Sequence, residues 1–103
     1  MNNTNYYSHL LSLMETRAAA VDLFERFLRA ETSWLTAPAS TRFHLSHPGG
    51  LVEHSLNVVR TLLRMRDILA PEISLESCVI VGLYHDVGKV GAPGNSLYLP
   101  NPD

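Results

Sequence analysis

The chain contains, at residues 78–89, the stretch Cys78-Val79-Ile80-Val81-Gly82-Leu83-Tyr84-His85-Asp86-Val87-Gly88-Lys89. Its first half is apolar and reads as a helix that packs into a core. Two adjacent ionisable residues, His85 and Asp86, follow, and burying them costs free energy unless something compensates their desolvation. A divalent metal ion would do so, because imidazole and carboxylate are two of its usual ligands. The stretch therefore predicts a helix that ends at a metal site.

A second informative stretch lies about thirty residues upstream, Ser46-His47-Pro48-Gly49-Gly50-Leu51-Val52-Glu53-His54. Pro48 is well placed as the first residue of a helix, and the glycine pair has no side chains to obstruct close packing against a neighbour. His54 would lie one turn into this helix, where it is the natural third ligand. The alternative is a partly exposed helix histidine without a ligand. The candidate metal ligands are His54, His85 and Asp86.

Length and composition indicate one small folded domain. The chain has 103 residues, of which 46 % are hydrophobic and 17 % charged, and a disordered chain would be poorer in apolar residues. The net charge of −2 argues against sequence-independent binding of duplex nucleic acid, which needs several Lys or Arg side chains on one face. If the partner is phosphorylated, the charge favours a phosphorylated small molecule or nucleotide, and nucleic acid is possible but not favoured.

The compartment is expected to be the cytoplasm, with no membrane contact. The first residues are polar and lack the basic and apolar segments of a signal peptide. No apolar run approaches the length needed to span a bilayer. The single cysteine, Cys78, cannot form an intrachain disulfide, and its apolar neighbours favour core packing over a reactive thiol.

Apolar residues recur with the period of a helix, so the predicted fold class is all-α. We expect helices from an N-cap at Thr4 to about residue 13, over residues 17–34, from Pro48 to before Pro71, and over residues 75–87. Ser74 would cap the last of these, and Gly88 and Gly91 would end it. Residues 92–103 contain three prolines and no periodicity, which predicts an irregular tail.

The second predicted helix has one apolar face, which includes Val21, Phe24 and Leu28 and continues to Leu35. Glu25 is expected on the opposite, solvated face, where it would form an i,i+4 pair with Arg29. The aromatic residues Phe24, Phe27 and Trp34 are expected in the core.

Taken together, the motifs resemble the HD-domain superfamily of metal-dependent phosphohydrolases, over residues 36–91. The resemblance implies a helical bundle in which His54 from one helix and the pair His85-Asp86 from a second bind the metal. It also implies an Asp ligand from a later helix, for which Asp103 in the Pro-rich tail is poorly suited. We therefore expect a domain that continues beyond residue 103, with residues 1–35 as an N-terminal helical region, 36–91 as the HD core and 92–103 as a tail.

A narrower resemblance is to the branch of 3′–5′ exoribonuclease-like HD proteins. It is carried by residues 37–40, by His44 ten residues before His54, and by the Gly-Gly-Leu turn. His44 and His47 are accordingly candidates for contacting the substrate. The alternative is that they are polar histidines of an irregular segment.

The resemblance implies hydrolysis of a phosphoester in a nucleotide or a nucleic-acid 3′ end, by a metal-activated water. Mixed His and carboxylate ligation suits Mn²⁺, Fe²⁺, Ni²⁺, Co²⁺ or Zn²⁺. Asp86 would bind the metal with one oxygen and orient the nucleophile with the other. The candidate catalytic residues are Asp86 and Lys89. Lys89 would contact the substrate phosphate as a point charge, or else interact with the helix dipole at a helix C-terminus.

Two alternatives to an enzyme stay open at this point. The chain could be a non-catalytic module that binds a nucleotide or a partner, with an incomplete metal site. It could also pair with a second copy of itself through apolar helix faces, as a homo-oligomer.

Overall fold

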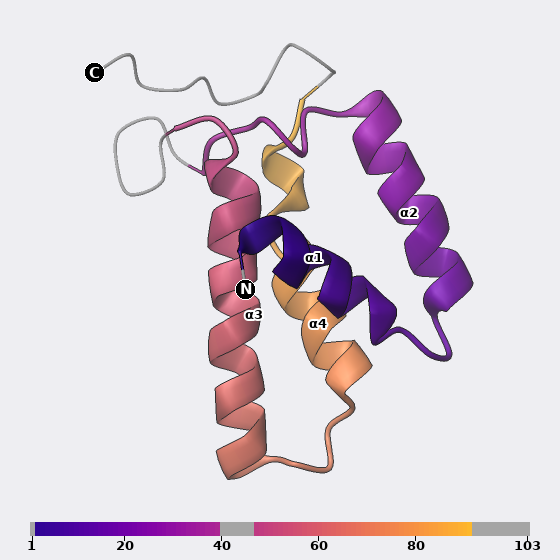
Figure 1. Cartoon of the computed structure of the whole chain (residues 1–103), viewed down its shortest axis with the longest axis vertical. Coiled ribbons are helices and arrows are strands. Elements are labelled where there is room, and N and C mark those ends of the chain that lie inside the picture. Colours follow the sequence, from indigo (N-terminus) through magenta and orange to yellow (C-terminus); the bar gives the residue numbers. More distant parts are fainter. Residues whose placement is uncertain (1, 40–46, 92–103) are drawn as a thin grey trace.

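The regular structure is helical in the computed structural model, which describes residues 2–39 and 47–91 (Figure 1). The helices are α1 (Asn3–Ser12), α2 (Ala18–Glu31), α3 (Gly50–Leu69) and α4 (Leu75–Tyr84), and the 3-10 turn η1 (Val87–Lys89) follows α4. No strand occurs within these ranges, which confirms the predicted all-α class. None of the described helices is both long and apolar enough to cross a membrane.

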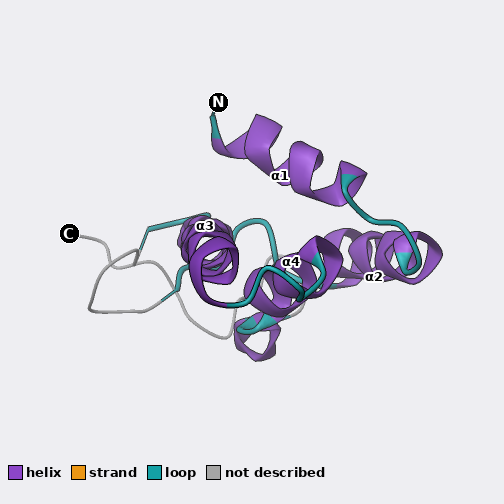
Figure 2. Ribbon diagram, turned by 90° about the horizontal axis from the view of Figure 1, so that it is seen from below, coloured by secondary structure: helices purple, strands orange, loops and turns teal. Residues whose placement is uncertain are grey.

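The helices α3 and α4 run antiparallel and make the most extensive helix–helix contact of the described structure. Figure 2 shows α1 on one side of the layer that α3, α4 and α2 form. Gly82 allows the close approach of α3 and α4, since a Cβ added there would lie only 2.8 Å from Val59 Cγ2. The hairpin thereby brings the start of α3 beside the end of α4, where the two predicted metal motifs lie.

The core between the helices is built from large apolar side chains. Trp34 is fully buried, as expected, and Phe24 packs edge-on against Tyr84 with ring centroids 4.9 Å apart. Phe27 was expected in the core, but its side chain is 53 % exposed, because it lies on the face of α2 turned away from the other helices. Cys78 is only half-buried. The fully or nearly fully buried apolar residues include Leu10, Leu28, Leu51, Leu56, Val59, Val79 and Leu83.

The observed helix ends agree with the predicted ones only in part. Ser74 caps α4 as predicted, because its hydroxyl accepts a hydrogen bond from the Ser77 amide at 3.0 Å. The N-cap of α1 is Asn2 instead of Thr4, and the Asn2 side-chain oxygen Oδ1 accepts a hydrogen bond from the Asn5 amide at 2.8 Å. The helix α2 ends at Glu31, before the predicted residue 34, so Leu35 lies beyond the helix and is exposed.

The start of α3 depends on Gly49. The helix begins at Gly50 and not at Pro48, and Gly49 precedes it with φ of 80°, in the left-handed region that favours glycine. The Gly49 amide donates to the Thr36 carbonyl at 3.0 Å, which ties the incoming chain to the helix start. Gly88 was expected to end α4, but α4 ends at Tyr84, and Gly88 lies inside η1 without a positive φ.

Glu25 is the main departure from the expected surface pattern. The residue is 5 % exposed, and its Oε2 accepts hydrogen bonds from Tyr7 at 2.5 Å and Tyr84 at 2.6 Å. Its Oε1 accepts from Arg29, so the predicted i,i+4 pair exists but reaches into the interior. Burial, together with the hydrogen bond to Glu25, raises the pKa of both tyrosines above the ordinary value.

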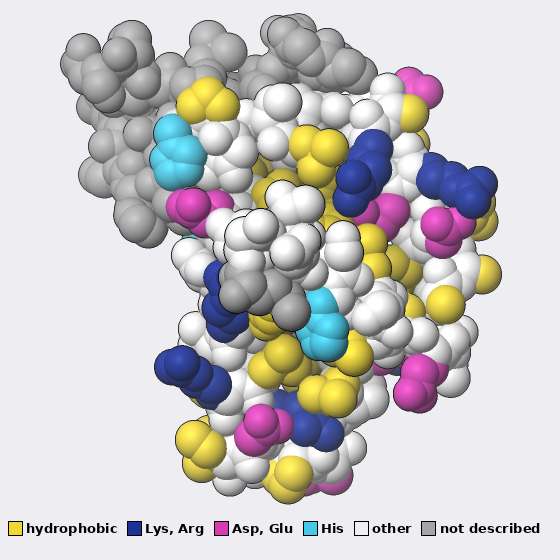
Figure 3. Space-filling model, viewed as in Figure 1, with side chains coloured by type: hydrophobic (Ala, Val, Ile, Leu, Met, Phe, Trp, Pro, Cys, Tyr) yellow, Lys and Arg dark blue, Asp and Glu magenta, His cyan; other side chains and the backbone are white. Residues whose placement is uncertain are grey.

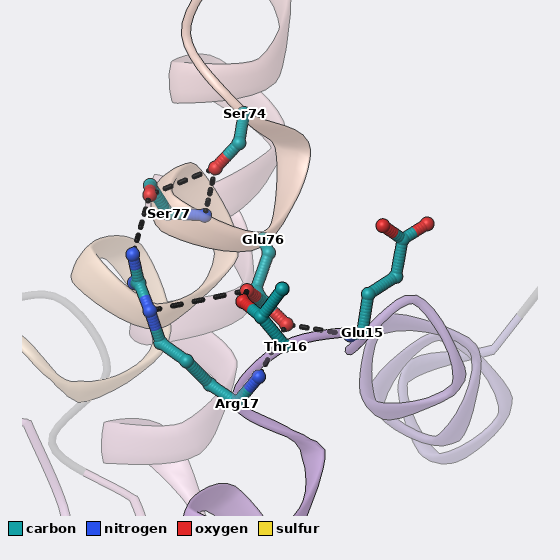
Figure 4. A network of polar contacts seen from close by, with 6 residues as sticks. All are labelled: Glu15, Thr16, Arg17, Ser74, Glu76 and Ser77. Atoms are coloured by element: carbon teal, nitrogen blue, oxygen red, sulfur yellow. Dashed lines mark hydrogen bonds and ion pairs between the residues drawn. The ribbon is translucent and has the colours of Figure 1, made fainter.

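A second carboxylate, that of Glu76, fastens the α1–α2 connection to the first turn of α4 (Figure 4). It accepts hydrogen bonds from the Thr16 hydroxyl at 2.7 Å and from the amides of Glu15 and Arg17 at 2.5 and 3.1 Å. These donors lower the pKa of the Glu76 carboxyl, the Thr16 hydroxyl most of all. The N-terminal helices are thus held to the α3–α4 hairpin by named polar contacts as well as by packing.

Candidate metal centre

Two elements present the three candidate ligands. His54 lies in the second turn of α3, and His85 is the residue that directly follows α4. Asp86 comes next, with φ of −112° and ψ of 17°, and leads into η1. This departure from helical geometry lets two neighbouring side chains turn toward the same point, although successive helical residues point about 100° apart.

The three ligand atoms lie close enough together to share one ion. His54 Nε2 is 3.3 Å from His85 Nε2 and 3.4 Å from Asp86 Oδ2, and His85 Nε2 is 3.3 Å from the same oxygen. Ligands of an ion held at about 2.0–2.2 Å stand roughly 3.0–3.5 Å from one another in tetrahedral or octahedral geometry. The spacing and the donor types therefore fit a divalent transition metal, and the group of His54, His85 and Asp86 could hold one.

The ring of His85 is oriented by a backbone contact. Its Nδ1 lies 2.8 Å from the Gly82 carbonyl oxygen, which can only accept, so Nδ1 carries the proton. The lone pair of a neutral ring is then on Nε2, the atom that faces His54 and Asp86. Such a hydrogen bond behind a histidine ligand fixes both its tautomer and its direction.

Lys89 adds a positive charge beside this group. Its Nζ lies 3.4 Å from Asp86 Oδ2 and donates to the Ala39 carbonyl at 3.0 Å. The side chain thus reaches back from the end of η1 to the centre and to the segment that precedes α3. The position suits both a contact with Asp86 and a contact with an anion that approaches the centre.

The centre is accessible to solvent. The side chains of His54, His85 and Asp86 are 36 %, 29 % and 24 % exposed. Three ligands leave further coordination positions of an ion to water, a substrate or other residues, which is the arrangement of a catalytic rather than a closed structural site.

The part of the chain that contains the candidate ligands is similar to a known protein family. Residues 51–100 match the family model of the HD domain. The matched region, called the HD region below, contains all three candidate ligands. No solved structure gives a significant match.

One curated protein is similar to part of this chain. It is the dihydroneopterin 2′,3′-cyclic phosphate phosphodiesterase of Methanocaldococcus jannaschii, 35 % identical over 57 residues. The alignment covers 52 % of this chain and 23 % of the relative. The chain thus spans less than a quarter of the relative's length.

Of the other predicted site residues, Lys89 lies beside the metal group and His47 lies apart from it. The His47 ring is 3.6 Å from the Glu53 carboxylate, and both residues line a cavity of about 390 Å³ together with Arg29 and Val52. None of the three candidate ligands lines this cavity, so His47 is not brought into the metal group. His44 and Asp103 lie outside the described residues.

The sequence analysis did not predict the hydrogen bond between Glu25 and Tyr84, which joins α2 to the last residue of α4. A signal for Glu25 was present, because it follows Val21 by four residues and precedes Leu28 by three, and both of these are buried. A charged residue at that spacing shares their face and must find partners in the interior.

Proposed function

We propose that this chain carries the metal-binding centre of an HD-type phosphohydrolase that cleaves a phosphoester bond. His54, His85 and Asp86 would hold one divalent transition metal ion. The observation that carries the proposal is the convergence of two imidazole nitrogens and a carboxylate oxygen to within 3.3–3.4 Å of one another, from elements about thirty residues apart in sequence.

The residues have separate roles in this proposal. A bound divalent ion supplies Lewis acidity toward a phosphoryl oxygen and toward water. The Gly82 carbonyl holds the proton of His85 on Nδ1 and so keeps Nε2 available as a ligand. Asp86 uses Oδ2 as a ligand and Oδ1 to orient the attacking water. Lys89 offers its charge to the substrate phosphate.

A small phosphodiester is the substrate class that we favour. The similar protein is named for a 2′,3′-cyclic phosphate, and acidic and basic side chains are interspersed on the face drawn in Figure 3, without a basic stripe among the described residues there. A strand of nucleic acid binds best to such a stripe. The narrower likeness to exoribonuclease-like HD proteins, with contacts from His44 and His47, stays a hypothesis.

The test is a hydrolysis assay with Mn²⁺ or Ni²⁺, using a 2′,3′-cyclic nucleotide and bis(p-nitrophenyl) phosphate. Asp86→Asn should lower the rate by about 100-fold or more, as expected when a group that stabilises developing charge is lost. Asp67→Asn is the matched control, because Asp67 is an exposed acid paired with Arg66 near the other end of α3.

Two results would contradict the proposal. Equal rates in the wild type and Asp86→Asn would show that the centre does not carry the reaction. Tight nucleotide binding without turnover, in a wild type that holds its metal, would favour the non-catalytic module.

A further inference from the structure

The last residue of α4, Tyr84, stands directly before the first of the paired ligands, His85. Its side chain points away from the metal group, toward α2 and the segment that follows α2. Its ring packs edge-on against Phe24 and lies 6.2 Å from the Trp34 ring. Its hydroxyl donates to Glu25 Oε2 at 2.6 Å.

The Glu25 carboxylate is held in place by more than this one contact. Tyr7 donates to the same oxygen, Arg29 donates to the other, and Trp34 Nε1 donates to the Tyr7 hydroxyl at 2.8 Å. A buried carboxylate is tolerated when several donors satisfy its lone pairs. Glu25 is therefore a fixed point in the interior against which Tyr84 is anchored.

We propose that Glu25 and Tyr84 are positioning residues of the metal centre, which act on the direction of His85. Consecutive side chains at a helix end are separated by a set rotation of about 100°. Holding Tyr84 against α2 therefore turns His85 toward His54 on α3. The inference rests on the proposed metal centre, and it assigns a role to α2, which lies outside the matched HD region.

The anchor matters because it joins α2 to the end of α4, whereas the contacts of Glu76 with Thr16 and Arg17 join the start of α2 to the first turn of α4. Among the described helices, α3 and α4 make by far the largest contact, and α2 has no comparable contact with α4. The last turn of any helix also lacks intrahelical partners for its carbonyls and is the part that frays most readily. The polar contact of Tyr84 with Glu25, supported by the edge of Phe24, restrains this turn.

The two tyrosines on Glu25 offer a matched pair of variants. Tyr84→Phe and Tyr7→Phe each remove one hydroxyl that donates to the same carboxylate oxygen. Tyr84 directly precedes the candidate ligand His85 in the chain, whereas Tyr7 lies on α1 and is not adjacent to a candidate ligand. A purely structural role of the network predicts similar effects of the two changes on the metal centre.

The first measurement is a Co²⁺ titration of the 103-residue chain, followed by visible absorption. Changes to groups that orient metal ligands typically weaken metal affinity by about 10- to 100-fold. We expect Tyr84→Phe to weaken Co²⁺ binding about tenfold and to change the absorption bands, and Tyr7→Phe to stay within about twofold of the wild type. Glu25→Gln, which keeps one acceptor oxygen, should resemble Tyr84→Phe.

The second measurement needs no metal. Hydrogen exchange of the His85 and Asp86 amides should be faster in Tyr84→Phe than in Tyr7→Phe. The amides in the middle of α3 serve as the internal reference and should exchange at the same rate in both variants. If the wild type binds no Co²⁺, the proposed function fails, and this comparison alone decides the positioning role. Equal effects of both variants on Co²⁺ affinity and on exchange would overturn the proposal.

Discussion

His85 uses both of its ring nitrogens, one toward the Gly82 carbonyl and the other toward His54 and Asp86. The residue types, together with the resemblance to the HD superfamily, predicted these three residues as one group. The distances were not predictable, because they depend on how α4 ends and on how closely α3 and α4 pack.

Glu25 shows the opposite case at the same scale. Its sequence neighbourhood contains Arg29 four residues later, which is the usual pattern of a solvated ion pair. Its partners Tyr7 and Tyr84 are 18 and 59 residues away. Only the tertiary structure brings them to it, so the spacing from Val21 and Leu28 could indicate the buried face of this acid but not its partners.

Glu76 carries a prediction about pH. Its pKa is lowered in the folded protein, chiefly by the Thr16 hydroxyl and the amides of Glu15 and Arg17. The unfolded chain therefore takes up a proton first as the pH falls. The stability that Glu76 contributes is complete above its unfolded pKa of about 4.3 and is lost as the pH falls through the lower folded value. Urea unfolding between pH 6 and 3 should show a steeper loss for the wild type than for Glu76→Gln.

The control for this prediction is Asp22→Asn, which also removes one carboxylate. Asp22 pairs with Arg26 at 3.0 Å on the surface of α2, where both side chains are well exposed, and such pairs contribute little. Its pH dependence should match that of the wild type. An equal slope in the wild type and Glu76→Gln would refute the role given to Glu76.

At the scale of elements, the α3–α4 hairpin determines whether the ligands meet. Apolar periodicity and the Ser74 cap predicted both helices, since these signals are local. The predicted start of α3 at Pro48 was wrong. The left-handed conformation of Gly49 is accompanied by a hydrogen bond to Thr36, thirteen residues earlier, which the local sequence pattern does not predict. The close contact at Gly82 likewise depends on Val59, more than twenty residues away.

Gly82→Ala is the test of this packing. The added methyl group would meet Val59 at 2.8 Å, and overpacking of this kind costs roughly 1–3 kcal/mol. We expect lower stability in urea unfolding and weaker Co²⁺ binding, because α4 must move away from α3. The double variant Gly82→Ala/Val59→Ala should be less destabilised than the sum of the two single changes.

Gly88→Ala is the matched control, because a Cβ at Gly88 would meet nothing within 4 Å. It should leave stability within about 0.5 kcal/mol of the wild type. If Gly82→Ala behaves in the same way as Gly88→Ala, the close approach of α3 and α4 is not what holds the hairpin.

At the scale of the molecule, the chain joins an N-terminal pair of helices to the HD region through two buried or partly buried carboxylates, Glu25 and Glu76. The sequence indicated the all-α class and the separate motifs, but not these long-range contacts. Large apolar side chains remain exposed at the far end of the α3–α4 hairpin, among them Met65, Ile68, Leu69, Ile73 and Leu75. Pairing with a second copy of the chain stays a prediction for this surface.

The metal centre itself is tested by the metal content of the purified chain, measured by elemental analysis after exposure to a mixture of divalent transition metals. We expect about one ion per chain, because a single group of three ligands is present among the described residues. The ion should be lost in His54→Ala and in His85→Ala, and retained in His9→Ala, a change of an exposed histidine on α1. A wild type without metal, or ligand variants that keep the same metal content, would contradict the assignment of this centre.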